Sequence, residues 1–378
     1  MNDAAPGFLM TILSFVAVIA PLIFVHELGH YFVGRWFGVK AETFSIGFGH
    51  EILGWTDRRG TRWKLGWLPI GGYVKFAGDM SPASTPTDDW LKLPPAERAQ
   101  TFQARSLWQK ALIVLAGPAT NFLVALLIFG AFTTAFGVLR TPARIGGFEA
   151  GSPAAAAGLA KGDLIRAIGG REIADYNDLK RFVVLRPRER VDVLADRNGK
   201  AVLVPVTIGE TVMVDRFGAR ASLGKLGVWS GKPVVERVPA LQVPAEAVKQ
   251  TWAMLQLLTD SLGQVITGAR PIKEMGGPLK IAQYSGEQAA SGWLPFAEFV
   301  ALISINLGFI NLLPIPMLDG GHLAFYAIAA IRRRPVSTRV LEWSFRGGLA
   351  LLLGMMVVVT FNDLASFGLF SKLGGLIG

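Results

Sequence analysis

The chain has 378 residues, 51% of them hydrophobic, and a mean hydropathy of +0.40, which is too apolar for an ordinary soluble protein. Because 17% of the residues are charged, the chain cannot lie in a membrane throughout, so we expect an inserted polar domain. The absence of cysteine excludes disulfides and thiol catalysis. The net charge of +10 is scattered apart from Arg332-Arg333-Arg334, a run that a cytoplasmic loop explains better, so no nucleic-acid partner is expected.

The first predicted element is a transmembrane helix within residues 1–36. Residues 8–25 carry no charge over 18 positions, which is near the lower limit for crossing about 30 Å of hydrocarbon, and the helix can continue through His30. A secretory signal peptide is the alternative, but the segment lacks both a basic start and a small-residue cleavage site. We therefore expect a retained membrane helix.

A metal-binding motif stands at the end of this predicted helix. His26 and His30 are four positions apart, so a helix places them on one face, where two imidazoles can bind one Zn²⁺. Glu27 can then act as a base toward a water at the metal. The alternative is a histidine pair packed in a helical core. Ionisable residues at the end of a membrane segment are costly in lipid, which favours the functional interpretation.

A polar stretch at residues 37–110 is expected to form a cytoplasmic, membrane-associated β-region. In residues 44–49 and 62–76 glycine alternates with β-forming residues, which predicts a small hairpin sheet. Residues 81–100 are rich in Pro, Ser, Thr and Asp, which predicts a loop. The aromatic side chains of this region that suit a membrane interface are Trp63, Trp67, Tyr73 and Phe76.

The second predicted transmembrane helix covers residues 111–139, which carry no charge. Near its start stands Gly117-Pro118, a pair that signals a kink or a close helix contact in a membrane helix. Asn121 follows one turn later and needs a hydrogen-bond partner at this depth. An ordinary interhelical hydrogen bond and a catalytic role both remain open for this residue.

The inserted region at residues 140–232 is soluble in composition. Residues 149–173 predict a turn, a short Ala-rich helix, a Gly-Asp turn, a strand and a Gly-Gly hairpin turn; a helix over residues 176–185 and two strands over residues 190–208 follow. The order resembles the bacterial type of PDZ domain, with the signature GSPAAxAGLxxGDxIxxIxG, over residues 145–210. PDZ domains bind chain ends or extended segments by strand addition. A PDZ domain that only blocks or spaces is the alternative.

A connecting region at residues 233–292 leads back to the membrane. Apolar residues recur at helical spacing between Val248 and Ile266, which predicts an amphipathic helix. This helix could lie on the membrane surface or pack on the inserted domain.

The third predicted membrane segment covers residues 293–325 and ends in a break. Pro314 and Pro316 interrupt the helix, and the backbone groups that they free are tolerated at membrane depth only where protein or water satisfies them. Asp319 follows the break and is the natural third zinc ligand, which leaves a fourth position for water. His322 could compete for that role, but it lies nearly a turn further on.

The last predicted region, residues 326–378, contains a basic loop and a fourth helix at about residues 347–361. Arginine crowds this loop, which is therefore expected to be cytoplasmic, as is the β-region. The inserted domain and both termini are then expected outside. The histidine motif and Asp319 both fall near the cytoplasmic ends of their helices, so they meet at one depth.

Four motifs together resemble the site-2 protease family and, within it, the bacterial regulator of sigma-E protease group. They are His26-Glu27-x-x-His30, Gly117-Pro118-x-x-Asn121, the PDZ signature, and Asn311-x-x-Pro314-x-Pro316-x-Leu318-Asp319-Gly320. The resemblance covers essentially the whole chain. It implies an α-helical polytopic membrane protein with about four transmembrane helices, a membrane-associated β-hairpin region and an inserted α+β PDZ domain.

The resemblance also implies an intramembrane zinc metalloprotease of the bacterial inner membrane, with its active site near the cytoplasmic side and its PDZ region and termini in the periplasm. Its expected partners are the lipid bilayer, single-pass membrane substrates of the anti-sigma-factor type, and an upstream site-1-type protease that trims them. Only one PDZ signature is visible, whereas some relatives carry two in tandem.

The site residues that the resemblance implies fall into three roles. The expected catalytic base is Glu27, and the expected zinc ligands are His26, His30 and Asp319. The expected substrate-binding residues are Asn311, Gly47, Phe48, Gly49, Tyr73, Pro314 and Pro316.

Two other functional classes make different demands on the sequence. A membrane scaffold with an inactive metal site predicts that a ligand or the base is lost, yet all of them are present. A transporter with histidine and aspartate relays predicts internal repeats and a polar path through several helices, and neither pattern is visible.

Overall fold

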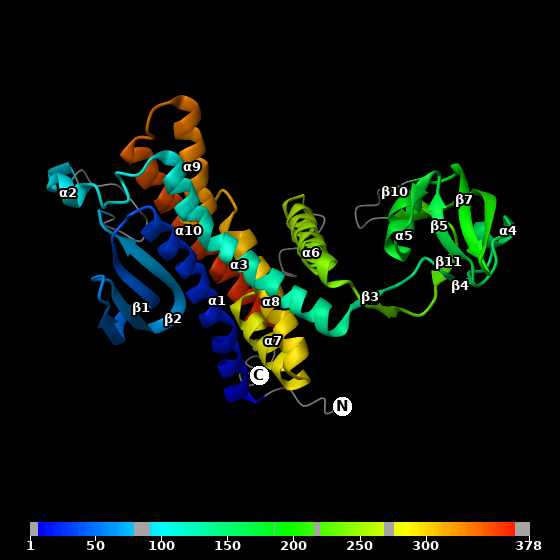
Figure 1. Cartoon of the computed structure of the whole chain (residues 1–378), viewed down its shortest axis with the longest axis horizontal. Coiled ribbons are helices and arrows are strands. Elements are labelled where there is room, and N and C mark those ends of the chain that lie inside the picture. The colour runs from blue at the N-terminus through cyan, green and yellow to red at the C-terminus, as the bar shows by residue number, and fades with distance from the viewer. Residues whose placement is uncertain (1–6, 79–90, 185, 215–219, 268–275, 367–378) are drawn as a thin grey trace, which may run out of the picture. The chain divides into compact units, whose positions relative to one another are not determined.

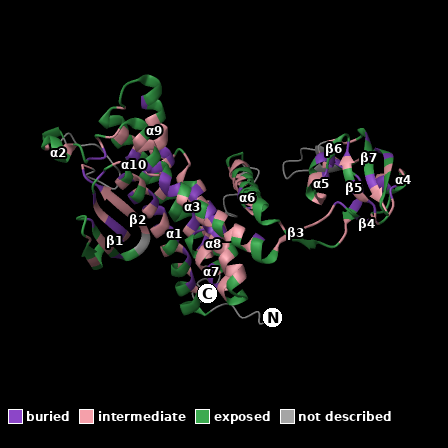
Figure 2. Ribbon diagram, in the orientation of Figure 1, coloured by how far each residue is buried: buried purple, intermediate pink, exposed green. Residues whose placement is uncertain are grey.

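The computed structural model describes residues 7–78, 91–184, 186–214, 220–267 and 276–366 (Figure 1). The chain divides into two compact units. The first contains residues 1–131 and 244–378, and the second is the inserted domain, residues 132–243. Each unit has its own buried residues (Figure 2).

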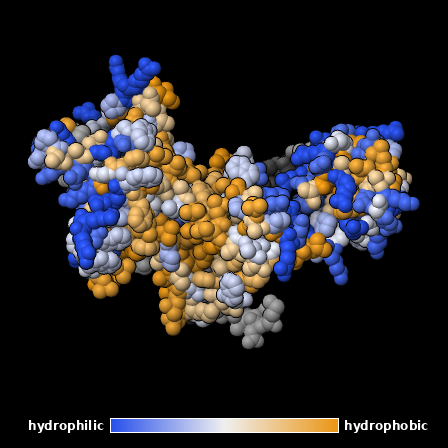
Figure 3. Space-filling view, viewed as in Figure 1, coloured by the Kyte–Doolittle hydropathy of each residue, from blue (hydrophilic) through white to orange (hydrophobic). Residues whose placement is uncertain are grey.

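Four helices among the described residues are long and apolar enough to cross a membrane, as predicted. They are α1 (Phe8–Trp36), α3 (Leu107–Phe136), α8 (Trp293–Asn311) and α10 (Thr338–Ser366). Apolar side chains gather on the surface of the first unit around these helices, whereas the inserted domain exposes a largely polar surface (Figure 3). The chain is therefore a membrane protein with one polar insert.

The helix ends differ from the predicted ones because an apolar run marks the hydrocarbon, not the limits of the helix. Helix α3 begins at Leu107 instead of residue 111 and ends at Phe136. Helix α10 begins at Thr338, nine positions before the predicted residue 347, because its first turns are polar helix outside the apolar window. The predicted break after the third helix is present, and residues 312–318 join α8 to α9 (Asp319–Arg332).

The predicted hairpin is present as β1 (Ala41–Thr56) and β2 (Arg62–Phe76). Both strands bend, so Phe44 has a partner on each side, Val74 and Trp63. Phe44 is 1% exposed and its ring stacks on Trp63 at 4.3 Å between centroids. Segment 72–76 thus forms an edge that lies against α1. A loop was predicted at residues 81–100, and its first part, up to residue 90, lies outside the described residues. In the remaining part, residues 95–98 form a short helix, α2 (Pro95–Arg98), where the sequence predicted a loop.

Three further helices complete the first unit: α6 (Val243–Ile266), α7 (Pro278–Ser291) and α9. Helix α6 covers the stretch predicted to be amphipathic, and its Met254, Leu255 and Leu258 pack on a cluster formed by α3 and α8. Part of this helix is therefore packed within the first unit, whereas Val248, Trp252 and Ile266 of the predicted apolar face remain exposed.

The inserted domain follows the predicted order of elements. It contains α4 (Pro153–Ala156), α5 (Tyr176–Val184) and a four-stranded antiparallel sheet of order β6-β5-β7-β8. The strands are β5 (Leu164–Ile168), β6 (Arg171–Glu172), β7 (Arg190–Arg197) and β8 (Lys200–Thr207). The predicted turn lies between β7 and β8, where Asn198 and Gly199 have φ values of 54° and 83°, as a two-residue hairpin requires.

The domain extends beyond the region of sequence resemblance. Strand β4 (Ile145–Phe148) pairs with β11 (Val228–Ser230), and β3 (Val138–Arg140) pairs with β12 (Val234–Glu236). A further hairpin joins β9 (Gly209–Val214) to β10 (Arg220–Lys225). These pairings connect residues up to about 100 positions apart, which is why local patterns could not predict them.

An ion pair between the buried Asp163 carboxylate and the partly exposed Arg197 stabilises the inserted domain. Asp163 is 1% exposed and accepts hydrogen bonds from Arg197 Nε at 2.8 Å and from the Ala160 amide at 2.8 Å. The Arg197 hydrogen bonds lower the pKa of the Asp163 carboxyl below its ordinary 3.8. The pair therefore stabilises the domain at neutral pH, and this stabilisation is lost as the pH falls from about 3.8 through the lower folded pKa.

We expect Asp163→Asn to destabilise the inserted domain by about 1–3 kcal/mol at pH 7, because Arg197 loses its charged partner. Thermal unfolding at several pH values checks this, and the difference from wild type should shrink in acid. Asp196→Asn is the matched control, since its partner Arg166 is 59% exposed and the loss of stability should be smaller than for Asp163→Asn. Equal effects of the two variants at pH 7 would contradict the assignment.

Candidate metal centre

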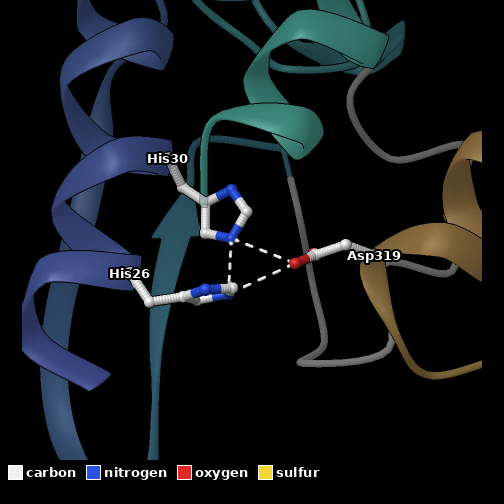
Figure 4. Close-up of side chains that lie close together, drawn as sticks. All are labelled: His26, His30 and Asp319. Atoms are coloured by element: carbon white, nitrogen blue, oxygen red, sulfur yellow. Dashed lines mark hydrogen bonds and ion pairs between the residues drawn. The ribbon is translucent and has the colours of Figure 1, made fainter. Parts of the chain in front are cut away.

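The two histidines of α1 point their Nε2 atoms toward each other. These atoms are 3.3 Å apart (Figure 4). His30 Nδ1 lies 2.8 Å from the backbone carbonyl oxygen of Ile113 in α3, an arrangement in which Nδ1–H donates. The lone pair of His30 is then on Nε2, which faces its neighbour and is available to a metal.

Asn121 of α3 orients the other histidine. Its side chain is completely buried, and Asn121 Nδ2 lies 3.1 Å from His26 Nδ1. Among the described residues, Asn121 Oδ1 is buried without a hydrogen-bond partner. Turning the amide by 180° gives Oδ1 the His26 Nδ1–H as donor, and the lone pair of His26 then lies on Nε2. The interhelical hydrogen bond, one of the two alternatives for Asn121, is therefore present, and its partner is a candidate zinc ligand.

Asp319 reaches the histidines from the first turn of α9. Its Oδ2 lies 3.2 Å from His26 Nε2 and 3.6 Å from His30 Nε2 (Figure 4). Among the described residues this buried oxygen has no hydrogen-bond partner. A carboxylate oxygen in this position is costly unless a cation completes it.

The three ligand atoms fit one zinc ion. Tetrahedral bonds of about 2.05 Å place neighbouring ligands about 3.3 Å apart, and the observed separations are 3.3, 3.2 and 3.6 Å. Gly117 leaves the necessary space, because a Cβ there would lie 2.3 Å from His30 Nε2. No other group of three or more histidine and acidic side chains with this proximity occurs in the part of the chain that the structure describes.

Glu27 lies beside the cluster and contacts the hairpin. It is 8% exposed and accepts a hydrogen bond from the Val74 backbone amide of β2. Gly72 gives it room, since a Cβ at that position would lie 3.0 Å from Glu27 Cγ. The carboxylate is thus held between the histidines and an exposed strand edge.

One cavity of about 590 Å³ joins these groups. Of the residues predicted from the sequence, its lining contains His26, Glu27, His30, Phe48, Tyr73, Asn311 and Asp319. Four predicted substrate-binding residues are not part of the lining: Gly47, Gly49, Pro314 and Pro316. The two glycines have φ values of +82° and +85° and form the bend of β1. The prolines lie in the break before α9.

His322 lines the same cavity but does not join the three ligand atoms. Its ring packs against Phe345 at 5.0 Å and Tyr326 at 6.4 Å between centroids. One turn of α9 separates it from Asp319. The geometry therefore favours Asp319 as the third ligand.

Sequence reasoning missed three contributors to the site. They are the Ile113 carbonyl, the space at Gly117 and the close approach of Gly72. Only Gly117 carried a signal, because Gly-Pro indicated a close helix contact without showing with what. Backbone carbonyls leave no trace in a sequence.

The fold and the site define a membrane metalloprotease, and comparisons with known proteins agree. The family model described as Peptidase family M50 matches residues 14–355. The "Putative zinc metalloprotease Atu1380" of Agrobacterium fabrum is 40% identical over 96% of this chain and 98% of its own length. Metalloprotease MmpA of Caulobacter vibrioides is 36% identical over 98% of this chain and 99% of its own length. The chain belongs to peptidase family M50, the site-2 protease type of zinc metalloprotease.

A solved PDZ domain is also similar to part of the chain. It is the PDZ domain of the SdrC-like protein Lin2157 from Listeria innocua, with 16% identity and a TM-score of 0.20. The likeness covers 25% of this chain and 99% of that domain.

We expect Asn121→Leu to weaken zinc binding by about 10–100-fold, because His26 loses the partner that fixes its ring and tautomer. Asn121→Asp is the conservative control, since a carboxylate oxygen also accepts from Nδ1–H and should retain most of the affinity. Competition with a chelating dye measures the zinc affinity of the purified variants. Wild-type affinity in Asn121→Leu would show that the contact does not orient the ligand.

Proposed function

We propose that this protein cleaves the transmembrane segments of single-pass membrane proteins, of the anti-sigma-factor type, after a site-1-type protease has trimmed them. The observation that carries the proposal is the position of the metal cluster, which is buried among membrane helices yet opens into the same cavity as the edge of β2. A buried protease site needs an access route for an apolar, extended substrate, and the cavity supplies one.

His26, His30 and Asp319 would hold the zinc ion. When bound, zinc supplies a Lewis acid that polarises the scissile carbonyl and makes a water more acidic. The chain's own groups perform the remaining steps.

Segment 72–74 of β2 would receive the substrate. A membrane helix hides its carbonyls in its own hydrogen bonds, so the substrate must unwind before one of them can react. Pairing with a strand edge replaces the lost hydrogen bonds. Tyr73 and Phe48 stack on each other at 5.9 Å beside this edge, and Asn311 faces the same cavity with an amide that can bind substrate backbone.

Glu27 would move the protons of the reaction. Its carboxylate lies next to the histidine cluster and is held by the Val74 amide. It takes a proton from the attacking water and returns it to the leaving amine as the peptide bond breaks.

The proposed location is the bacterial inner membrane, with the β-region and the arginine-rich loop in the cytoplasm and the inserted domain and both termini in the periplasm. The support is the concentration of arginine between α9 and α10. Both halves of the metal cluster then lie near the cytoplasmic ends of their helices.

Glu27→Gln should reduce cleavage by about 10²–10⁴-fold while zinc stays bound, because the base is lost and all three candidate ligands remain. Cleavage of a purified transmembrane substrate and metal content are measured on the same preparation. Glu298→Gln, an exposed change on α8, is the control. Near wild-type cleavage by Glu27→Gln would exclude Glu27 as the base.

Asp319→Asn should weaken zinc binding by more than the roughly 100-fold that loss of an orienting partner costs, because a neutral amide is a poorer ligand. His322→Asn is the matched comparison and should keep its zinc. Metal analysis after dialysis against a chelator gives the result. If His322→Asn lost more zinc than Asp319→Asn, His322 would be the third ligand instead of Asp319.

Cysteine labelling tests the orientation, and the native chain has no cysteine to interfere. Single cysteines replacing Arg58 and Asn198 should label from opposite sides, with residue 198 accessible from the periplasm. Labelling of residue 198 only after the inner membrane is breached would invert the proposed orientation.

A further inference from the structure

Helix α10 carries two arginines and a tryptophan on one exposed face near its start. Arg339, Trp343 and Arg346 follow one another at intervals of four and three residues, so they lie on the same side of the helix. All three side chains are exposed. The Arg346 guanidinium lies over the Trp343 ring, 5.6 Å from its centroid. We call these three residues the α10 stripe.

The positive charge of the stripe is not neutralised within the chain. Among the residues that the structure describes, the guanidinium groups of Arg339 and Arg346 form no ion pair and no hydrogen bond, not even with Glu342 between them. Residues 331–346 contain five arginines against this one glutamate, and the other three arginines, residues 332–334, are also exposed. A basic surface of this kind attracts an anion.

An exposed apolar surface continues the stripe along α10. Residues 347–361 contain no charged residue, and Leu353 and Val357, which prolong the same face, are 48% and 65% exposed. Side chains of a helix tilt toward its N-terminus, so the Arg346 guanidinium over Trp343 points away from this apolar run. Basic groups, an aromatic ring and an apolar surface thus follow one another in the order of a membrane interface.

The opposite face of the same turns is closely packed. Phe345 is 4% exposed, and its ring lies 5.9 Å from the Phe325 ring of α9 between centroids. A Cβ at Gly348 would lie 2.3 Å from the Pro316 carbonyl oxygen. The backbone under the α10 stripe is therefore held in place, and a ligand has to order only the exposed side chains, which lowers the entropic cost of binding.

We propose that the α10 stripe is a binding site for an anionic phospholipid. The headgroup phosphate pairs with the Arg339 and Arg346 guanidinium groups, Trp343 lies at the boundary between headgroup and chains, and the acyl chains follow the apolar face past Leu353. Arginine suits this role because its planar group can donate two parallel hydrogen bonds to a phosphate. A zwitterionic headgroup carries its own cation, so the site selects lipids with a net negative charge.

The test places a fluorescent reporter beside the stripe in the full-length protein. The chain has no cysteine, so Ala350→Cys, at an exposed position on the same face, accepts a single bimane label. The labelled protein is reconstituted in phosphatidylcholine vesicles, and lipids with brominated acyl chains are added as phosphatidylglycerol or as phosphatidylcholine. Relative quenching should show about fivefold or greater preference for phosphatidylglycerol, the contribution of one arginine at an anionic surface. Arg339→Gln/Arg346→Gln should abolish the preference.

Two controls separate a defined site from general attraction. Arg171→Gln/Arg181→Gln removes the same charge from the exposed surface of the inserted domain and should retain the preference. A bimane label at Leu123→Cys, a position on α3 that is 51% exposed, should report no preference. Equal preference at both labels, or its persistence without the two stripe arginines, would overturn the site.

Two measurements on the labelled chain with its arginines intact do not depend on how the arginine variants fold. Raising the ionic strength to about 1 M should bring the preference near one, because salt screens exposed charges. An excess of glycerol 3-phosphate should leave the quenching unchanged, because it lacks the acyl chains. A preference that resists salt would refute the charge pairing, and relief of quenching by glycerol 3-phosphate would identify a phosphate site instead of a lipid site. Lipid binding needs no step of the proposed proteolysis, so either proposal can fail alone.

Discussion

The close approach of α1 and α3 is the constraint on which the metal centre depends. A Cβ at Gly29 would lie 2.4 Å from the Ala116 carbonyl oxygen, and one at Gly117 would collide with His30. Because neither position has a side chain, α3 comes near enough for Ile113 and Asn121 to fix the two imidazoles. A larger residue at either glycine would separate the helices, and the ligands would lose their orientation before any of them was changed.

Polar groups at membrane depth need hydrogen-bond partners within the protein, and this requirement explains most of the remaining architecture. The break at residues 312–318 frees backbone groups, and it is closely packed, since a Cβ at Gly348 would lie 2.3 Å from the Pro316 carbonyl oxygen. Ser304 Oγ donates to the Asn121 carbonyl at 2.8 Å, so α8 is fastened to the helix that orients the histidines. These contacts stabilise a polar site without opening it to lipid.

The sequence predicted what depends on local spacing and left out what depends on distant contacts. The histidine motif needed only the helical period, and the turn at Asn198-Gly199 needed only its two residues. The partner of Asn121 lies 95 positions away, and the partner of β11 is a strand about 80 positions earlier. Helix limits were wrong by up to nine residues because hydropathy reports the lipid boundary, whereas α10 continues past it. No pattern within a single segment contains that information.

Two strand edges in this chain differ in which backbone group already has a side-chain partner: an amide at residues 72–74 and a carbonyl in β11. At the edge formed by residues 72–74, the Val74 amide interacts with the Glu27 carboxylate, and this is the edge to which the proposed function assigns substrate pairing. At the edge of β11, the Val228 carbonyl accepts a hydrogen bond from the Tyr176 hydroxyl at 2.6 Å. Backbone pairing alone distinguishes few sequences, because every peptide offers the same amides and carbonyls. Selectivity must therefore come from what restricts access to an edge.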